Sequence, residues 1–132
     1  MGRPLPPPSN TELAVLHLLW ERGPSSIRTL ADHLYPGGGP SEYATVHRLL
    51  ERLEGKKYVR RDRAEGVMVF RALLDRDTVL GQQVETLVQR MCGGSLQPLL
   101  STLIKSKRLS AEELRELLEM VEKESRPKKA GK

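Results

Sequence analysis

Seven arginine and lysine side chains gather in one short stretch of this sequence, between His47 and Arg63. Only three carboxylates accompany them, so the stretch carries a local net charge of +4. Cationic side chains that approach nucleic-acid phosphates release condensed counterions, and this release favours binding. These residue types therefore indicate contact with a polyanion. The alternative is a solvated basic surface that keeps a small domain soluble.

The first of these cations fall on a predicted helix over residues 41–56, which Ser41 would open. At about 100° per residue, the arc opposite its apolar face is small, polar and basic. That arc consists of Ala44, Thr45, His47, Arg48, Glu51 and Arg52. Arg48 is a candidate for bidentate contact with guanine. Thr45 is suited to a thymine methyl group or a phosphate, and His47 to a base acceptor or a phosphate.

Other chemistries find no support in the residue types. His17 and His33 form no His/Cys/Asp cluster with ligand spacing, so we predict no metal site. Residues 37–39 are glycines, but the Lys and Ser/Thr of a phosphate-binding loop do not follow them. The single cysteine, Cys92, excludes an intramolecular disulfide and favours a reducing compartment. No nucleophile has a positioned base, so we expect neither an enzyme nor a cofactor.

The chain has 132 residues and a net charge of +5, which fits one compact domain or one small domain plus an interaction segment. No window approaches a membrane span, and the N-terminus lacks the apolar stretch of a signal peptide. We therefore predict a cytoplasmic protein with no direct membrane binding.

The helices and strands that position these cations are predicted from the spacing of apolar residues and from helix-capping residues. Helices are predicted over residues 10–22, with a Ser9–Glu12 capping box, and over 27–34, capped by Ser25 or Ser26. Strands over 58–61 and 67–73, joined by a loop at 62–66, follow the helix at 41–56. Further helices are predicted over 77–91, over 96–105 and from Ser110 onward.

Three helices and a basic hairpin, in this order, are typical of a winged helix-turn-helix domain. In that fold the third helix enters the major groove and the hairpin contacts the flanking backbone. The predicted fold class is mainly α with a small β-hairpin wing, followed by a C-terminal helical dimerisation region. The side chains that we assign to DNA are Ser26, Ser41, Tyr43, Ala44, Thr45, His47, Arg48, Arg52, Arg61 and Arg63. In the wing, Arg61 and Arg63 would contact phosphates.

The last three helices carry more apolar surface than the winged domain would cover. We predict that a second copy buries it through Leu80, Val84, Leu87, Leu99, Leu103, Ile104, Leu114, Leu117 and Leu118. The alternative is a helical subdomain folded back within one chain. The predicted organisation is a flexible arm (1–9), a winged domain (10–75), a dimerisation region (76–125) and a basic disordered tail (126–132).

With these motifs placed, the sequence resembles the penicillinase repressor family, which includes the methicillin-resistance and copper-responsive repressors of bacteria. The resemblance is carried by TELAVLHLLWERGPSSIRTLADHL (11–34), YATVHRLLERLEGKKYVRRDR (43–63) and GGSLQPLLSTLI (93–104). It implies a homodimer of winged domains that binds a palindromic operator in double-stranded DNA and blocks transcription. It also implies relief of repression by a membrane metalloprotease receptor, with the matching bond at Thr102–Leu103.

The sequence departs from the family pattern in three places. It lacks the Asn-Phe pair of the best-known members at the cleavage position, and it lacks the C-terminal cysteine cluster of the copper-responsive branch. Lys57 stands where many members have Gly, so we expect Gly55 to end the third helix slightly earlier.

A function of another class is a winged-helix protein-interaction module whose basic face meets an acidic protein. Salt-dependent binding to a duplex from the gene's own promoter region would favour the repressor. Equal affinity for any polyanion would favour the interaction module.

Overall fold

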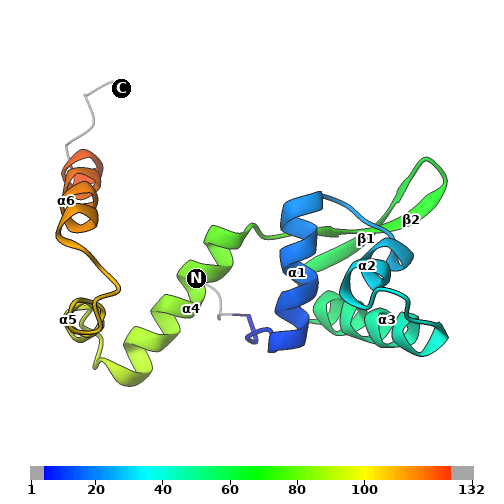
Figure 1. Cartoon of the computed structure of the whole chain (residues 1–132), viewed down its shortest axis with the longest axis horizontal. Helices are drawn as coiled ribbons and strands as arrows, with labels where there is room; N and C mark the ends of the chain where they lie inside the picture. Colours follow the sequence, from blue (N-terminus) through cyan, green and yellow to red (C-terminus); the bar gives the residue numbers. More distant parts are fainter. Residues whose placement is uncertain (1–4, 126–132) are drawn as a thin grey trace. The chain divides into compact units, whose positions relative to one another are not determined.

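The computed structural model describes residues 5–125, and in this part of the chain six helices and one antiparallel hairpin follow one another (Figure 1). The elements are α1 (Asn10–Arg22), α2 (Ile27–Leu34), α3 (Pro40–Gly55), β1 (Val59–Ala64), β2 (Val67–Ala72), α4 (Arg76–Met91), α5 (Gln97–Lys105) and α6 (Ala111–Ser125). This order confirms the predicted fold class, a mainly helical chain with a hairpin wing.

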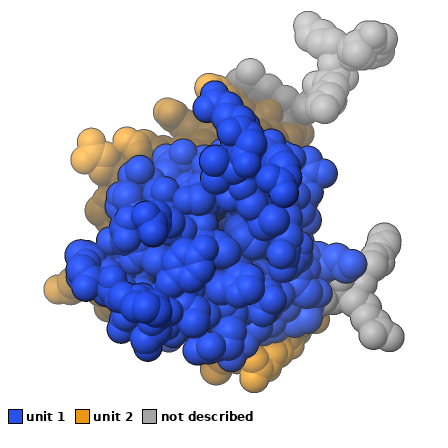
Figure 2. All heavy atoms as spheres, turned by 90° about the vertical axis from the view of Figure 1, so that its right-hand side faces the viewer, with its two compact units in different colours: residues 1–84 blue, residues 85–132 orange. Residues whose placement is uncertain are grey.

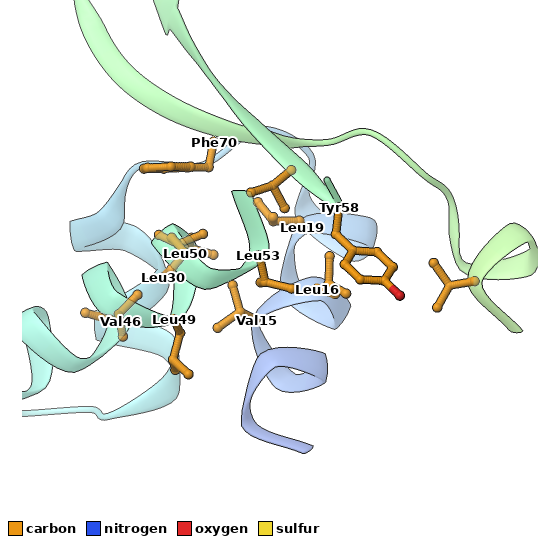
Figure 3. Packing of buried hydrophobic residues seen from close by; sticks show 13 residues of the cluster. Val15, Leu16, Leu19, Leu30, Val46, Leu49, Leu50, Leu53, Tyr58 and Phe70 are labelled. Atoms are coloured by element: carbon orange, nitrogen blue, oxygen red, sulfur yellow. The ribbon is translucent and has the colours of Figure 1, made fainter. Parts of the chain in front are cut away.

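The core lies among α1, α2, α3 and the hairpin (Figure 3). Its helical members are the apolar residues that recur at helical spacing, because only one face of each helix meets the others. The buried cluster consists of Val15, Leu16, Leu19, Leu30, Ala31, Val46, Leu49, Leu50, Leu53, Tyr58, Val59, Phe70 and Val79. Phe70 extends from the hairpin over this cluster, so the wing is packed onto the helices that carry the basic residues (Figure 3).

The helix starts agree with the predicted caps, with one correction. The Ser9–Glu12 capping box opens α1, and the Ser26 hydroxyl caps α2 by accepting from the Thr29 N–H. The prediction that Ser41 opens α3 is wrong. Pro40 occupies the first turn, where its missing N–H costs nothing, and Gly39 is the N-cap.

The hairpin is tighter than the sequence predicts. In place of a loop over residues 62–66, β1 continues through Ala64 and pairs with β2, in a register that ends at Ala64 opposite Val67. Only Glu65 and Gly66 remain in the turn, with φ values of 53° and 79°. Two central residues with positive φ are what a type I′ turn requires. Arg63 therefore lies on a strand.

The chain forms two compact units, Met1–Val84 and Glu85–Lys132, shown in blue and orange in Figure 2. The sequence predicts a boundary at residue 75. The first unit extends further because Val79, in the first half of α4, is buried in the core of the winged domain. The predicted basic tail over 126–132 lies outside the described residues.

The N-terminal arm is anchored from Leu5 onward, whereas the sequence predicts flexibility through residue 9. Leu5 packs against the core, the Tyr58 hydroxyl donates to the carbonyl of Pro6 (2.7 Å) and the Lys56 ammonium donates to the carbonyl of Pro7 (3.1 Å). Proline lacks an N–H but its carbonyl still accepts hydrogen bonds. The described part of this proline-rich segment thus belongs to the winged domain, and residues 1–4 lie outside the description.

The C-terminal end of α3 is a Schellman turn with lysine where glycine is usual. Lys57 has a φ of 75° and its N–H donates to the Glu54 carbonyl, while the Tyr58 N–H donates to the Leu53 carbonyl. The helix ends at Gly55, as expected, but Gly55 is not the left-handed residue of the turn, because that conformation is taken by Lys57. The two apolar side chains of the motif, Leu53 and Tyr58, are both buried.

Lys57→Gly should therefore raise the free energy of unfolding by roughly 0.5 kcal/mol. Glycine avoids the cost of about 1–2 kcal/mol that a residue with a Cβ atom pays in the left-handed conformation. The larger conformational entropy of glycine in the unfolded state offsets about 0.4–1 kcal/mol of this gain. The matched variant Gly55→Ala should gain about 0.4–1 kcal/mol, because a methyl group there meets no atom within 4 Å. Urea titrations followed by the fluorescence of Trp20, the sole tryptophan, measure both. Destabilisation by Lys57→Gly would contradict the left-handed conformation.

Candidate nucleic-acid interface

The outward side of α3 carries two arginines that the rest of the domain leaves free. Arg48 and Arg52 are both exposed, and within residues 5–125 neither forms an ion pair. Their position follows from the burial of Val46, Leu49 and Leu53 on the opposite side of the helix. Two guanidinium groups without ion-pair partners in residues 5–125, on one side of a helix, are suited to donate hydrogen bonds to phosphate oxygens or to the acceptors of guanine.

The side of α3 next to the wing carries a row of polar side chains in contact with one another. His47 Nε2 lies 3.7 Å from Glu51 Oε2, and Glu51 Oε2 lies 4.0 Å from Arg61 Nη2. Arg61 Nε also donates to both carboxylate oxygens of Glu54, at 3.0 and 3.2 Å. The sequence predicts a phosphate contact for Arg61 as well as for Arg63, but in the structure the Arg61 side chain binds Glu54 of α3 instead.

The small and polar residues predicted to meet DNA lie around the start of α2 and of α3. The Ser26 hydroxyl caps α2. The Thr45 hydroxyl donates to the Ser41 carbonyl at 3.0 Å, so the methyl group and the oxygen lone pairs of Thr45 are left for a ligand. Ser41 and Tyr43 are exposed, and Ala44 is half-buried. Tyr43 also lines a hollow of about 420 Å³ between α2 and α3, whose other residues include Arg28 and Asp32.

The outer part of the wing holds the cations that remain available. Arg63 donates to the Gly66 carbonyl (3.2 Å) across the turn and has no carboxylate partner among the described residues. Arg71 is paired with Asp62 at 3.0 Å. The backbone N–H of Arg63 and the Arg71 guanidinium lower the pKa of the Asp62 carboxyl. Arg60, an exposed cation opposite Arg71 in the hairpin register, is not among the residues that the sequence assigns to DNA, although it contributes to the local charge of +4.

A buried ion pair fixes the end of α3 against α1. Glu12, only 1% exposed, accepts from Lys56 Nζ at 2.7 Å and from the Ser9 N–H at 2.9 Å. Burial raises the pKa of Glu12, but the lysine and the backbone donor outweigh it, so this pKa lies below its ordinary value of 4.5. Burial and the Glu12 charge raise the pKa of Tyr58. The pair holds α3 in place and does not face outward.

The second unit presents an uncovered apolar surface. No residue of α5 or α6 is buried, and apolar side chains line a hollow of about 610 Å³ within this unit. The apolar lining consists of Leu96, Leu100, Leu109, Leu114, Leu117, Leu118, Met120 and Val121. Of the residues predicted for dimerisation, Leu118 is 54% exposed, Ile104 49% and Leu117 43%. Leu80 is 54% exposed in the first half of α4.

No group of three or more His, Cys, Asp or Glu side chains within residues 5–125 is arranged to hold a metal ion. None of the helices in the described part of the chain is long and apolar enough to cross a membrane.

Comparison with known proteins adds the family. A model of the penicillinase repressor matches residues 8–123. No curated protein matches the chain. Among solved structures, a transcriptional regulator from Thermotoga maritima is 20% identical with a TM-score of 0.46, over 91% of this chain and 80% of that one. Since the family model spans nearly the whole chain, the chain belongs to the penicillinase repressor family of DNA-binding transcriptional repressors.

Proposed function

We propose that this repressor binds a palindromic operator as a homodimer, with α3 of each copy in the major groove and the outer wing on the flanking phosphates. The observation that carries this proposal is the pair of exposed arginines, Arg48 and Arg52, which form no ion pair with any residue of the described range 5–125 and lie on the outward side of the third helix of a repressor. Within the wing, Arg63 and Arg60 are the cations suited to phosphates.

Self-association is supported by the surface of the second unit. Exposed apolar patches of this kind are typical of protein interfaces, and two copies of one surface meet most simply about a two-fold axis. A two-fold protein binds a two-fold DNA sequence, which is why the operator should be palindromic. The proposed dimer contacts are the α4–α6 residues predicted from the sequence, together with Leu96 and Leu100 of the apolar hollow.

Arg48→Ala should weaken operator binding by roughly 1–3 kcal/mol and leave the free energy of unfolding unchanged, because the side chain is exposed and carries a base contact. Fluorescence anisotropy with an operator duplex and with a scrambled duplex of equal length measures it. The matched control is Arg22→Ala, an exposed arginine at the end of α1. Operator binding by Arg48→Ala equal to that of the control would refute the assignment of α3 to the groove. Equal affinity of the wild type for both duplexes and for heparin would favour the protein-interaction module.

Release by proteolysis is the finer part of the proposal. The Thr102–Leu103 bond lies inside α5, where the Thr102 hydroxyl donates to the Pro98 carbonyl (2.8 Å), so the helix must open before a protease can bind it extended. Within its own chain α5 buries no side chain, so only the contacts with the second copy oppose this opening. A membrane metalloprotease is one candidate for the enzyme. A cut would separate Leu103, Ile104 and α6 from the rest of the dimer surface.

A foreign protease site placed at Thr102–Leu103 tests this without any receptor. Cutting the purified dimer should yield monomeric winged domains that leave the operator, as measured by sedimentation and anisotropy. Mock-treated protein and wild type with protease are the controls. A cut product that stays dimeric and operator-bound would rule out this route of release.

A further inference from the structure

Glu51 occupies an unexpected place for a DNA-binding helix. It lies on the outward arc of α3 beside Arg48, with its side chain 51% exposed. A carboxylate there is repelled by the phosphates on both sides of a groove. Glu54, one turn further on, adds a second negative charge on the side of α3 that meets the wing. The interface therefore contains two carboxylates that oppose binding to any DNA.

Arg61 is the cation that these carboxylates hold. Its Nε donates to both oxygens of Glu54 and its Nη2 lies 4.0 Å from Glu51. Its guanidinium carbon also lies 5.4 Å from the centre of the Phe70 ring, the residue opposite it in the hairpin. Arg63, two residues further along the same strand, has no carboxylate partner among the described residues. The two wing arginines thus have different surroundings.

We propose that Glu51 and Glu54 are specificity-determining residues that act through Arg61. By holding it on α3 they keep one cation off the phosphates and fix the wing relative to the recognition helix. This inference rests on the proposed function, because it takes α3 and the wing as the surfaces that meet DNA. Arg61 is then a positioning residue, and Arg63 makes the phosphate contact.

This arrangement would favour the operator over other DNA for two physical reasons. Binding to arbitrary DNA depends almost entirely on phosphate electrostatics, so removing a free cation and adding carboxylates weakens it. Binding to the operator also needs α3 and the wing in one register, and a wing held in advance loses less conformational entropy there. Specificity arises when a repulsive element accompanies the attractive contacts.

The test is the salt dependence of binding by the full-length chain, measured with an operator duplex selected by that chain and with a scrambled duplex. Arg63→Ala should reduce the slope of log K against log salt by about 0.9 per subunit, the value for one lost phosphate contact. Arg61→Ala should leave that slope at the wild-type value and weaken operator binding only. Arg61→Lys should restore part of the operator affinity.

The gain-of-binding variant is Glu51→Gln/Glu54→Gln, which releases Arg61. Its slope on scrambled DNA should increase by about 0.9 per subunit, and its affinity for that duplex at 0.1 M salt should rise roughly three- to tenfold for each subunit that contacts the duplex. Operator affinity should rise less, so the ratio of the two affinities falls at least threefold. Loss of two negative charges by itself raises affinity for any polyanion, so the increased slope is the result that assigns the effect to a phosphate contact by the released Arg61.

The outcomes separate failure of this inference from failure of the proposed function. If Arg61→Ala flattens the slope as much as Arg63→Ala does, Arg61 itself contacts phosphate and the inference is overturned. Unchanged affinity of the Gln variant for scrambled DNA overturns it as well. If Arg48→Ala and Arg63→Ala both bind as wild type does, α3 and the wing do not meet DNA, and the proposed function fails first.

Discussion

Truncation after Val84 should leave a folded, monomeric winged domain that binds a two-half-site operator about 10²–10⁴-fold more weakly than the full chain. The first compact unit ends at Val84 and keeps Val79, so its core remains whole. The fragment loses α5, α6 and the end of α4, which carry the exposed apolar surface. Without a linked partner, each winged domain must find its half-site independently, which removes the gain from high effective concentration.

Sedimentation and anisotropy with duplexes that contain one or two half-sites measure this effect. On a single half-site, the fragment and the full chain should bind with equal affinity, because the recognition surface is the same. A fragment that ends at Leu74 is the instructive control. It should be less stable, because it removes Val79, which is only 3% exposed in the core. A full-length chain that sediments as a monomer at micromolar concentration would contradict the dimer.

Local sequence features predict the helices of the winged domain well, because the forces that form them act over a few residues. The predicted bounds of the first helix, 10–22, are those of α1. Its start is fixed by the reciprocal bonds of Ser9 and Glu12, and its end by Gly23 with a φ of 84°. Apolar spacing likewise identifies the buried face of α3, because helical periodicity alone decides which side chains share a face.

Contacts between distant residues are what the sequence could not supply. A proline-rich start predicts flexibility, since nothing in residues 5–8 indicates that Tyr58, 52 residues beyond Pro6, donates to it. The boundary at residue 75 is too early for the same reason, because the burial of Val79 depends on the packing of α4.

Charge counting has the same weakness at the candidate interface. The net charge of +4 treats all seven cations between residues 47 and 63 alike. The fold engages Lys56 with Glu12 and Arg61 with Glu54, and leaves Arg48, Arg52 and Arg63 without ion pairs in the described part of the chain. A helix residue and a strand residue seven positions apart show no spacing rule that would predict the Arg61–Glu54 bond. Fewer cations are therefore available to a ligand than the net charge of this stretch suggests.

The second large effect should come from Lys56→Met, which we expect to lower the free energy of unfolding at pH 7 by about 3–5 kcal/mol, the cost of leaving a buried charge without its partner. Glu12 is fully buried and would keep only the Ser9 N–H as a donor. Glu12→Gln should cost less, about 2–3 kcal/mol, because Lys56 is 26% exposed and can turn toward water. The double variant should cost less than the sum of the two, since the pair is coupled.

The loss of stability in Lys56→Met should depend on pH, because Glu12 titrates differently with and without the lysine. In the wild type the folded pKa of Glu12 is lowered, so its stabilising contribution is present above the ordinary value of 4.5 and is lost as the pH falls through the folded pKa. In Lys56→Met the burial of Glu12 is no longer offset by the lysine, so the pKa of Glu12 should rise. Acid then protonates Glu12 and removes the buried charge that has no partner. The stability deficit of Lys56→Met should thus shrink between pH 7 and pH 3, as measured by urea unfolding followed through Trp20.

The matched control for the buried pair is Glu42→Gln. Glu42 accepts the N–H of the N-cap Gly39 at 2.8 Å, as Glu12 accepts that of Ser9, but it forms no ion pair with a described residue. The backbone N–H donors of Gly39 and of Glu42 itself lower the pKa of Glu42. Its replacement should thus change stability far less and leave Lys56 in place. If Glu42→Gln and Glu12→Gln cost the same, the capping bond rather than the lysine stabilises this corner, and the attachment of α3 to α1 would rest on backbone contacts alone.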